Sequence, residues 1–413
     1  MGILLKDDFF DFQTLRALGY APYGAADVGE CVTTAQRITR VDQRDWIENW
    51  LATATRIRNN ADECLAAGDR AGARSAYFRA SNYFRTANIF ALETGALPTL
   101  RAGYANEVSS FRAGAALLDV PPRILEIPYE GQTLPGYFFT PSNDDRTRPT
   151  LILTNGYDGT AEELYFANGI AALERGYNVL IFDGPGQGAM IIERGVVFRP
   201  DWENVVTPVV DFALTLPGVD PSTLVLLGPS FGGYLAPRAA TREHRLAACI
   251  SDCGPYDLFD ASVSRVPDFL ASSLPSGSSK RVRLAILRRI LSSVMRQTTS
   301  GWALRRNLLV HGVADPIAFF DLAPQYSLKG IEHLIECPTL VCSAEGDDLS
   351  VRAPLLFQAL QCEKKYVKFA AADGAGSHCE ASARTLFHAT VFAWLESVLG
   401  EGRPNSSKSD SIS

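Results

Sequence analysis

The sequence has no excess of basic charge and no long apolar run, and both absences restrict its partners. Its 39 lysine and arginine residues are outnumbered by 46 aspartate and glutamate residues, so the formal net charge is -7. A chain with this balance has little means to displace counterions from phosphates, so we expect no nucleic-acid partner. No apolar run approaches the roughly 18 residues that a membrane-spanning helix needs, so we expect no membrane partner.

Motifs for metals and cofactors are also missing. The eight cysteines are scattered without a Cys-x-x-Cys pair, and no His-Glu-x-x-His motif occurs, so we expect no metal and free thiols in a reducing compartment. The stretch FDGPGQG (182–188) lacks the glycine spacing of a dinucleotide-binding loop, and Pro185 removes an amide that a phosphate would use. We therefore expect no cofactor. The acidic N-terminal stretch MGILLKDDFFDF is unlike a signal peptide, so we expect a cytoplasmic location.

The first part of the chain has a helical pattern. Between residues 42 and 92, apolar residues recur every three or four positions in two runs, with a break near Gly68. This spacing predicts a helical hairpin. We expect an N-terminal helical domain over residues 1–120.

Strands and helices alternate from residue 121 onward. The stretch RILEIPYEGQTLPGYFFTP predicts a two-stranded hairpin that turns at Gly131. The apolar runs TLILT, YNVLIFD and TLVLLG then each precede a helical pattern. Such alternation predicts an α/β fold with a mostly parallel sheet flanked by helices. We expect this core to occupy residues 121–254 and 330–400.

The segment between these two parts, residues 255–329, is mostly helical in pattern. We expect it to form an inserted helical cap. Its basic amphipathic stretch 281–296 fits a cap helix, and contact with a membrane surface is the alternative. The polar tail 401–413 is expected to be disordered.

The stretch GPSFGG places Ser230 between a predicted strand and a predicted helix. This is the context of a G-x-S-x-G nucleophile elbow, in which the serine occupies a sharp, strained turn and close backbone packing requires small neighbours. Gly228 and Gly232 meet that requirement. We therefore expect Ser230 to be a nucleophile, and the alternative is a structural glycine-rich turn.

A serine hydroxyl needs a base, and that base needs an acid to orient it. His378 is the histidine that lies in a glycine-rich loop, DGAGSHCE, between a predicted strand and the last helix, so we expect it to be the general base. For the acid we expect Asp347, on the first turn after the strand LVCSA. Asp348 and Asp252 are the alternatives.

An oxyanion hole needs two backbone amides aimed at the developing charge. The amide of Phe231 directly follows the nucleophile, at a predicted helix N-terminus whose amides are free. We expect the second amide to come from Tyr157 in the loop NGYDGT, because Gly156 and Gly159 allow this backbone to approach the site.

Taken in order, NGYDGT, FDGPGQG, GPSFGG, EGDD and GAGSHCE resemble the α/β-hydrolase superfamily. More narrowly, the chain is similar to a branch with an N-terminal helical domain, which includes 2,6-dihydroxypseudooxynicotine hydrolase and fungal polyketide-shortening pigment hydrolases. The resemblance spans roughly residues 40–400 and leaves the first forty unplaced. It implies the chain order serine, acid, histidine at Ser230, Asp347 and His378. It also implies a substrate-binding acid in the oxyanion loop, matched here by Asp158, and the neighbouring Tyr157 suits contact with a planar substrate.

The resemblance implies hydrolysis of a carbon–carbon bond next to a ketone in a small-molecule substrate, such as a β-diketone of secondary metabolism. It also implies a possible homodimer. Hydrolysis of an ester, thioester or lactone, or acyl transfer or cyclisation, uses the same residues and is the alternative reaction class. A hydrolase fold retained as a binding module is the non-enzymatic alternative, and the presence of all three triad candidates disfavours it.

Overall fold

The computed structural model describes most of the chain. The described residues are 2–91, 97–144, 146–263, 266, 281–297 and 301–400. The predicted disordered tail lies outside them, as does part of the predicted cap.

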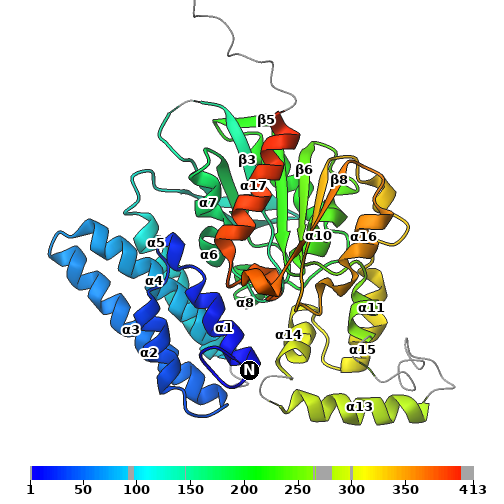
Figure 1. The fold of residues 1–413 in the computed structure, drawn as a ribbon, viewed down its shortest axis with the longest axis horizontal. Coiled ribbons are helices and arrows are strands. Elements are labelled where there is room, and N and C mark those ends of the chain that lie inside the picture. The colour runs from blue at the N-terminus through cyan, green and yellow to red at the C-terminus, as the bar shows by residue number, and fades with distance from the viewer. Residues whose placement is uncertain are drawn as a thin grey trace, which may run out of the picture.

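The core is an eight-stranded sheet with strand order β1-β2-β4-β3-β5-β6-β7-β8 (Figure 1). The strands are β1 (Arg123–Tyr129), β2 (Gln132–Phe139), β3 (Arg148–Leu153), β4 (Asn178–Phe182), β5 (Val219–Pro229), β6 (Leu246–Asp252), β7 (Thr339–Ala344) and β8 (Lys364–Phe369). The hairpin of β1 and β2 is antiparallel, as is the pair β2 and β4, and all other pairs are parallel. The predicted mostly parallel sheet is therefore confirmed, as is the hairpin turn, where Gly131 has φ 77°.

Helices cover both faces of the sheet because the parallel strands are apolar on both sides. Ile152 and Leu180 face one cluster, which includes α9 (Glu203–Ala213), α10 (Gly232–Ala240) and α16 (Ala353–Ala359). Their neighbours Leu151 and Val179 face the opposite cluster. The helices of that second cluster include α6 (Ala161–Leu164), α7 (Ile170–Leu173) and α17 (Arg384–Gly400).

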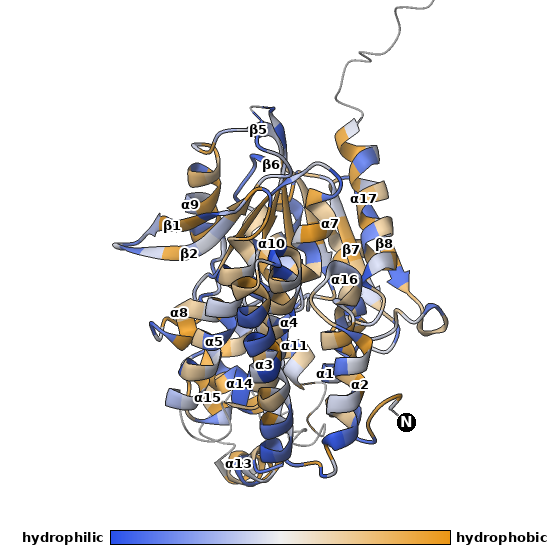
Figure 2. Cartoon of the chain, turned by 90° about the vertical axis from the view of Figure 1, so that its left-hand side faces the viewer, coloured by the Kyte–Doolittle hydropathy of each residue, from blue (hydrophilic) through white to orange (hydrophobic). Residues whose placement is uncertain are grey.

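Five helices precede the sheet. They are α1 (Asp8–Leu18), α2 (Val28–Arg37), α3 (Gln43–Ala66), α4 (Arg70–Asn88) and α5 (Leu97–Ala115). The predicted hairpin is the pair α3 and α4, whose apolar residues, among them Trp46, Trp50 and Tyr83, form one buried cluster. The outward side of α3 is polar (Figure 2). The helical character of this region is confirmed, and its boundary as a domain stays a prediction.

Further helices lie between β6 and β7. They are α11 (Leu258–Val263), α13 (Arg281–Met295), α14 (Trp302–Val310) and α15 (Pro316–Leu322). Leu287 of α13 packs against Ile317 and Phe320 of α15. Within the described ranges, no helix combines the length and apolar character needed to cross a bilayer. Figure 1 shows α14 facing α1 at the end of the sheet where α17 begins.

Candidate active site

Ser230 occupies a sharp turn between β5 and α10. Its φ of 59° is a left-handed conformation that L-residues adopt only under constraint. A Cβ atom on Gly228 would lie 1.9 Å from the carbonyl oxygen of Gly232, and one on Gly232 would lie 2.6 Å from that of Thr154. Both positions therefore require glycine. The turn is further held by the Ser230 amide, which donates to the carbonyl of Asp252 at 2.9 Å.

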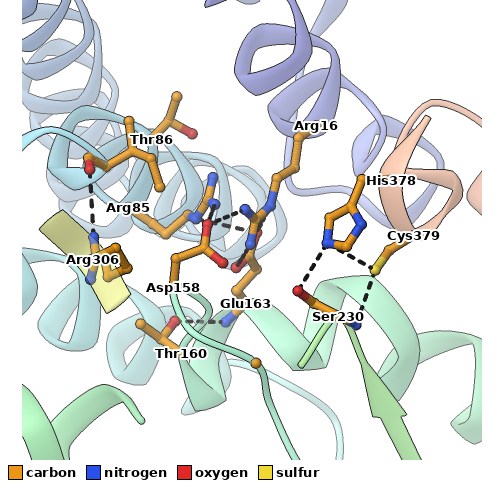
Figure 3. A network of polar contacts seen from close by, with 12 residues as sticks. Arg16, Arg85, Thr86, Asp158, Thr160, Glu163, Ser230, Arg306, His378 and Cys379 are labelled. Atoms are coloured by element: carbon orange, nitrogen blue, oxygen red, sulfur yellow. Dashed lines mark hydrogen bonds and ion pairs between the residues drawn. The ribbon is translucent and has the colours of Figure 1, made fainter. Parts of the chain in front are cut away.

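The structure brings Ser230, His378 and Asp347 into one hydrogen-bonded row. His378 Nε2 lies 2.9 Å from Ser230 Oγ (Figure 3), and His378 Nδ1 lies 2.8 Å from Asp347 Oδ2. Asp347 also accepts from the Leu349 amide, which fixes the carboxylate. Of the two alternative acids, Asp348 is exposed and Asp252 is fully buried at the end of β6. Asp347 is the acid that contacts the imidazole.

The pKa values in this row are shifted in opposite directions. Burial alone would raise the pKa of Asp347, but the facing imidazole and the Leu349 amide hold it below its usual value. Burial alone would lower the pKa of His378, but Asp347 and the thiol of Cys379 hold it well above its usual value. The arrangement thus stabilises an imidazolium beside a carboxylate, which is the charge state that proton transfer from Ser230 creates.

Two cysteines, Cys253 and Cys379, lie beside the nucleophile turn. The sequence patterns gave neither of them a role in the site. Cys379 Sγ accepts from the Ser230 amide at 3.1 Å and lies 3.5 Å from His378 Nε2. Cys253 donates to Glu380 Oε1 at 3.4 Å. Cys253, Cys379 and Glu380 all have positive φ, so the backbone beneath the site is strained at several points. The motif GSHCE places Cys379 directly after His378 in the sequence. Nothing in the sequence spacing indicated that Cys253 would lie close to Cys379.

Cys253, Cys379 and Asp252 also form the one candidate metal-ligand group among the described residues. Their ligand atoms lie within 4.8 Å of one another. However, Asp252 already faces the guanidinium of Arg384 at 3.9 Å, and Cys379 Sγ already accepts from Ser230. We interpret the group as internal support for the elbow.

The loop after β3 approaches the nucleophile closely. A Cβ atom on Gly156 would lie 2.9 Å from Ser230 Cβ and 3.0 Å from the amide nitrogen of Phe231. The rings of Tyr157 and Phe231 stack with centroids 4.5 Å apart. Within the part of the chain that the structure describes, neither amide of this pair donates a hydrogen bond. Both predicted oxyanion donors are therefore available and adjacent.

A buried histidine holds the side chain of Tyr157. The Tyr157 hydroxyl lies 2.9 Å from His311 Nε2, and His311 Nδ1 lies 3.1 Å from the Tyr326 hydroxyl. Burial lowers the pKa of His311 to about 3, so its ring is neutral. His311 caps the C-terminal end of α14, and the sequence carried no signal that this end meets the loop of Tyr157.

Asp158 lies among arginines and does not face the triad row (Figure 3). Its carboxylate pairs with Arg16 at 2.7 Å and with Arg85 at 3.8 Å. Glu163 pairs with the same two arginines, at 2.7 and 3.2 Å. Burial would raise the pKa of Asp158, but these guanidinium groups and Arg306 lower it well below its usual value, so it is ionised. The predicted role of Asp158 in substrate binding stays a prediction.

The first helix contributes to the site, although the sequence analysis could not place the first forty residues. Arg16 is on α1, and the ring of Phe12 lies 6.3 Å from that of His378. Tyr20 follows α1 and donates to Glu163 at 2.8 Å. Helix α1 therefore lies over the loop that carries Tyr157 and Asp158.

Comparison with known proteins supports the resemblance drawn from the motifs. Residues 151–389 match the model of the "Alpha/beta hydrolase family". The chain is 36% identical to "Hydrolase LUC6" of Fusarium sp, over 96% of this chain and 98% of that protein. It is also 36% identical to "20-hydroxy-prefusarin hydrolase FUS2" of Gibberella moniliformis, over 95% and 97%. The structure of 2,6-dihydroxy-pseudo-oxynicotine hydrolase matches with a TM-score of 0.73 at 21% identity, over 94% of this chain and 97% of that one.

Proposed function

Because the chain belongs to the alpha/beta hydrolase family, we propose that it is a serine hydrolase that cleaves a carbon–carbon bond next to a ketone. The row Ser230–His378–Asp347 carries the proposal. It pairs a nucleophile on a strained turn with a base, and the base with an acid. The expected substrate is a β-diketone of polyketide type.

The proposed reaction begins at Ser230. His378 takes the proton from Ser230 Oγ, which adds to the carbonyl carbon, while Asp347 stabilises the imidazolium. The oxyanion accepts hydrogen bonds from the amides of Phe231 and Tyr157. The carbon–carbon bond then breaks, and the leaving carbon receives a proton from His378. Water, activated by the same histidine, releases the acid from the acyl-enzyme.

Two observations support the choice of substrate class. The relative FUS2, which is 36% identical over 95% of this chain, is named as a hydrolase of 20-hydroxy-prefusarin. Aromatic rings from four segments pack together at the predicted oxyanion donors: Tyr157, Phe198, Phe231 and Tyr326. An aromatic cluster of this kind beside the nucleophile is compatible with a planar, conjugated acyl group.

The second candidate function keeps the same residues. An ester, thioester or lactone hydrolase, or an acyltransferase or cyclase, would use Ser230 in the same way, because the leaving group is selected by the pocket and not by the triad. The matched relatives named only as hydrolases favour neither reaction.

The test is a comparison of two substrates that share one acyl group. The purified protein and the Ser230→Ala variant are incubated with 1-phenylbutane-1,3-dione and with phenyl benzoate, and release of benzoate, or of acetophenone where the acetyl carbonyl of the dione is attacked, is measured. The proposal expects the wild type to release product from both the dione and the ester, and the Ser230→Ala variant to release product from neither. Release from the ester alone would contradict carbon–carbon cleavage and leave ester hydrolysis.

A further inference from the structure

The loop NGYDGT (155–160) is held at its two ends by its own polar side chain. The amide of Asn155 donates to the Thr160 carbonyl at 3.0 Å, and its side-chain oxygen accepts from the Gly156 backbone at 2.8 Å. The middle of the loop differs: among the described residues, no acceptor binds the backbone amide of Tyr157. An amide that is to receive an oxyanion has to stay free in this way, so another contact must fix its direction.

The backbone around Tyr157 does not fix that direction by itself. Gly156 precedes this residue and Gly159 follows two positions later, and glycine restricts the backbone less than any other residue. Asp158 is tied to Arg16 at 2.7 Å, which holds the loop one residue further on. The orientation of the Tyr157 amide therefore depends on how its own side chain is attached.

The Tyr157 side chain is attached at both its ring and its hydroxyl. The ring stacks on that of Phe231, with centroids 4.5 Å apart and an angle of 24° between the planes. The hydroxyl lies 2.9 Å from His311 Nε2. Since Phe231 carries the other predicted donor amide, the side chains of both donor residues form one stacked pair, and His311 holds its outer end.

His311 is itself fixed from several sides. It is 4% exposed, and the rings of Phe198 and Phe319 lie 5.6 and 5.5 Å from its own. Its Nδ1 lies 3.1 Å from the hydroxyl of Tyr326, which is fully buried. Because burial lowers the pKa of His311 to about 3, the ring is neutral and carries one donor and one acceptor. It can therefore donate to one of the two hydroxyls and accept from the other.

We propose that His311 is a positioning residue: it holds the side chain of Tyr157, and through it the Tyr157 amide, in the direction that the oxyanion requires. This inference rests on the proposed attack by Ser230 and adds a further residue to that reaction. An oxyanion forms on the attacked carbonyl of a dione and of an ester alike, so the role of His311 is the same for both. The segment between β6 and β7 thus takes part in stabilising the transition state.

The first experiment replaces His311 and measures kcat and KM separately, with 1-phenylbutane-1,3-dione and with phenyl benzoate. His311→Phe keeps a ring in place but removes both hydrogen bonds, and it should lower kcat by about 10- to 100-fold, as a misplaced oxyanion donor does. The KM should stay within about threefold, because the donor acts in the transition state. His311→Gln, which retains a donor and an acceptor, should recover most of the lost kcat. The acid limb of the pH profile, which reports His378, should not move.

The second experiment is a double-mutant cycle. Tyr157→Phe removes the hydroxyl that bonds to His311 and should lower kcat to a similar extent. The double variant Tyr157→Phe/His311→Phe should lie within about threefold of either single variant, because all three lose the same hydrogen bond.

The matched controls come from a second buried tyrosine–histidine pair. The hydroxyl of Tyr23 is bonded to His388 Nδ1, and both residues belong to or contact the apolar cluster on the opposite face of the sheet. Tyr23→Phe and His388→Phe should leave kcat within about threefold of the wild type. Thermal unfolding of all variants measures the loss of stability, which should be similar for the two pairs.

Three results would overturn the positioning role: a loss of stability in His311→Phe with kcat unchanged, additive losses in the double variant, or a shifted acid limb, which would place the effect on His378. Failure of the proposed function is distinct from these. If the wild type cleaves only phenyl benzoate, carbon–carbon cleavage fails while the ester still reports the effect of His311. If it cleaves neither substrate, the rate at which a fluorophosphonate labels Ser230 is measured instead. That rate should fall about 10-fold in His311→Phe, since the phosphonyl oxygen uses the same two amides, and an unchanged rate would overturn the role.

Discussion

Arg16 of the first helix donates to Asp158 of the oxyanion loop at 2.7 Å, although 142 positions separate the two residues. The contact ties the N-terminal helices to the loop that carries Tyr157. Both side chains are largely buried, at 14% and 13% exposure, so the ion pair is shielded from water. The first helix therefore packs against the active-site loop and helps to hold it in place.

We predict that Arg16→Met lowers the free energy of unfolding by about 3 kcal/mol, because two carboxylates lose a buried partner. Urea denaturation measures the change. The control is Arg146→Met, whose partner Asp144 is 3.9 Å away and whose own side chain is 84% exposed; it should cost less than about 0.5 kcal/mol. Equal effects of the two substitutions would refute a structural role for Arg16.

Gly156→Ala should strongly reduce turnover without unfolding the protein. The new Cβ would lie 3.1 Å from Ser230 Oγ and 3.0 Å from the Phe231 amide, in the space where the oxyanion is expected. We predict a loss of kcat/KM of about 100-fold or more. The control is Gly29→Ala on α2, where the added atom meets only the Asp27 side chain, at 3.2 Å. Near-normal turnover in Gly156→Ala would place the oxyanion elsewhere.

Asp347→Asn should reduce kcat by about 10³- to 10⁴-fold, because the amide cannot hold His378 in the required tautomer. Asp348→Asn should stay within about threefold of the wild type, since Asp348 is exposed and Asp347 is the acid bonded to the imidazole. Steady-state kinetics on the same substrate compares them. If both substitutions reduced kcat only slightly and to the same extent, Asp347 would not be the triad acid, and Asp252 would be the remaining candidate.

Cys379→Ala should shift the acid limb of the kcat/KM profile to lower pH. Catalysis requires neutral His378, so activity is lost as pH falls through the pKa of this histidine. Cys379 is among the groups that raise that pKa, and its removal therefore lowers it. Cys362→Ala, which removes a thiol bonded to Thr339 on β7, should leave the limb unchanged. An unshifted limb in Cys379→Ala would show that the thiol does not act on His378.

Local patterns predicted the fold and the row of three residues. Ser230, His378 and Asp347 each follow a strand of the parallel sheet, and the carboxyl ends of such strands meet at one edge. The need for glycine on either side of Ser230 arises from backbone atoms close by, so the motif G-x-S-x-G already indicated it. The sequence could therefore indicate which strand ends supply the site.

The rest of the site depends on how distant segments pack. Arg16, His311 and Cys253 have ordinary neighbours in the sequence, and each gains its role from a residue more than 100 positions away. Periodicity within a helix tells which side is buried but not which loop that side meets. For this reason the arginines paired with Asp158 and the histidine that contacts Tyr157 could not be predicted.

Intact-protein mass spectrometry after treatment with a fluorophosphonate shows whether Ser230 is the nucleophile. The wild type should gain the mass of one phosphonyl group, and Ser230→Ala should gain none. Ser382→Ala, which removes an exposed serine four residues after His378, should label like the wild type. Equal labelling of the wild type and Ser230→Ala would mean that Ser230 is not the nucleophile.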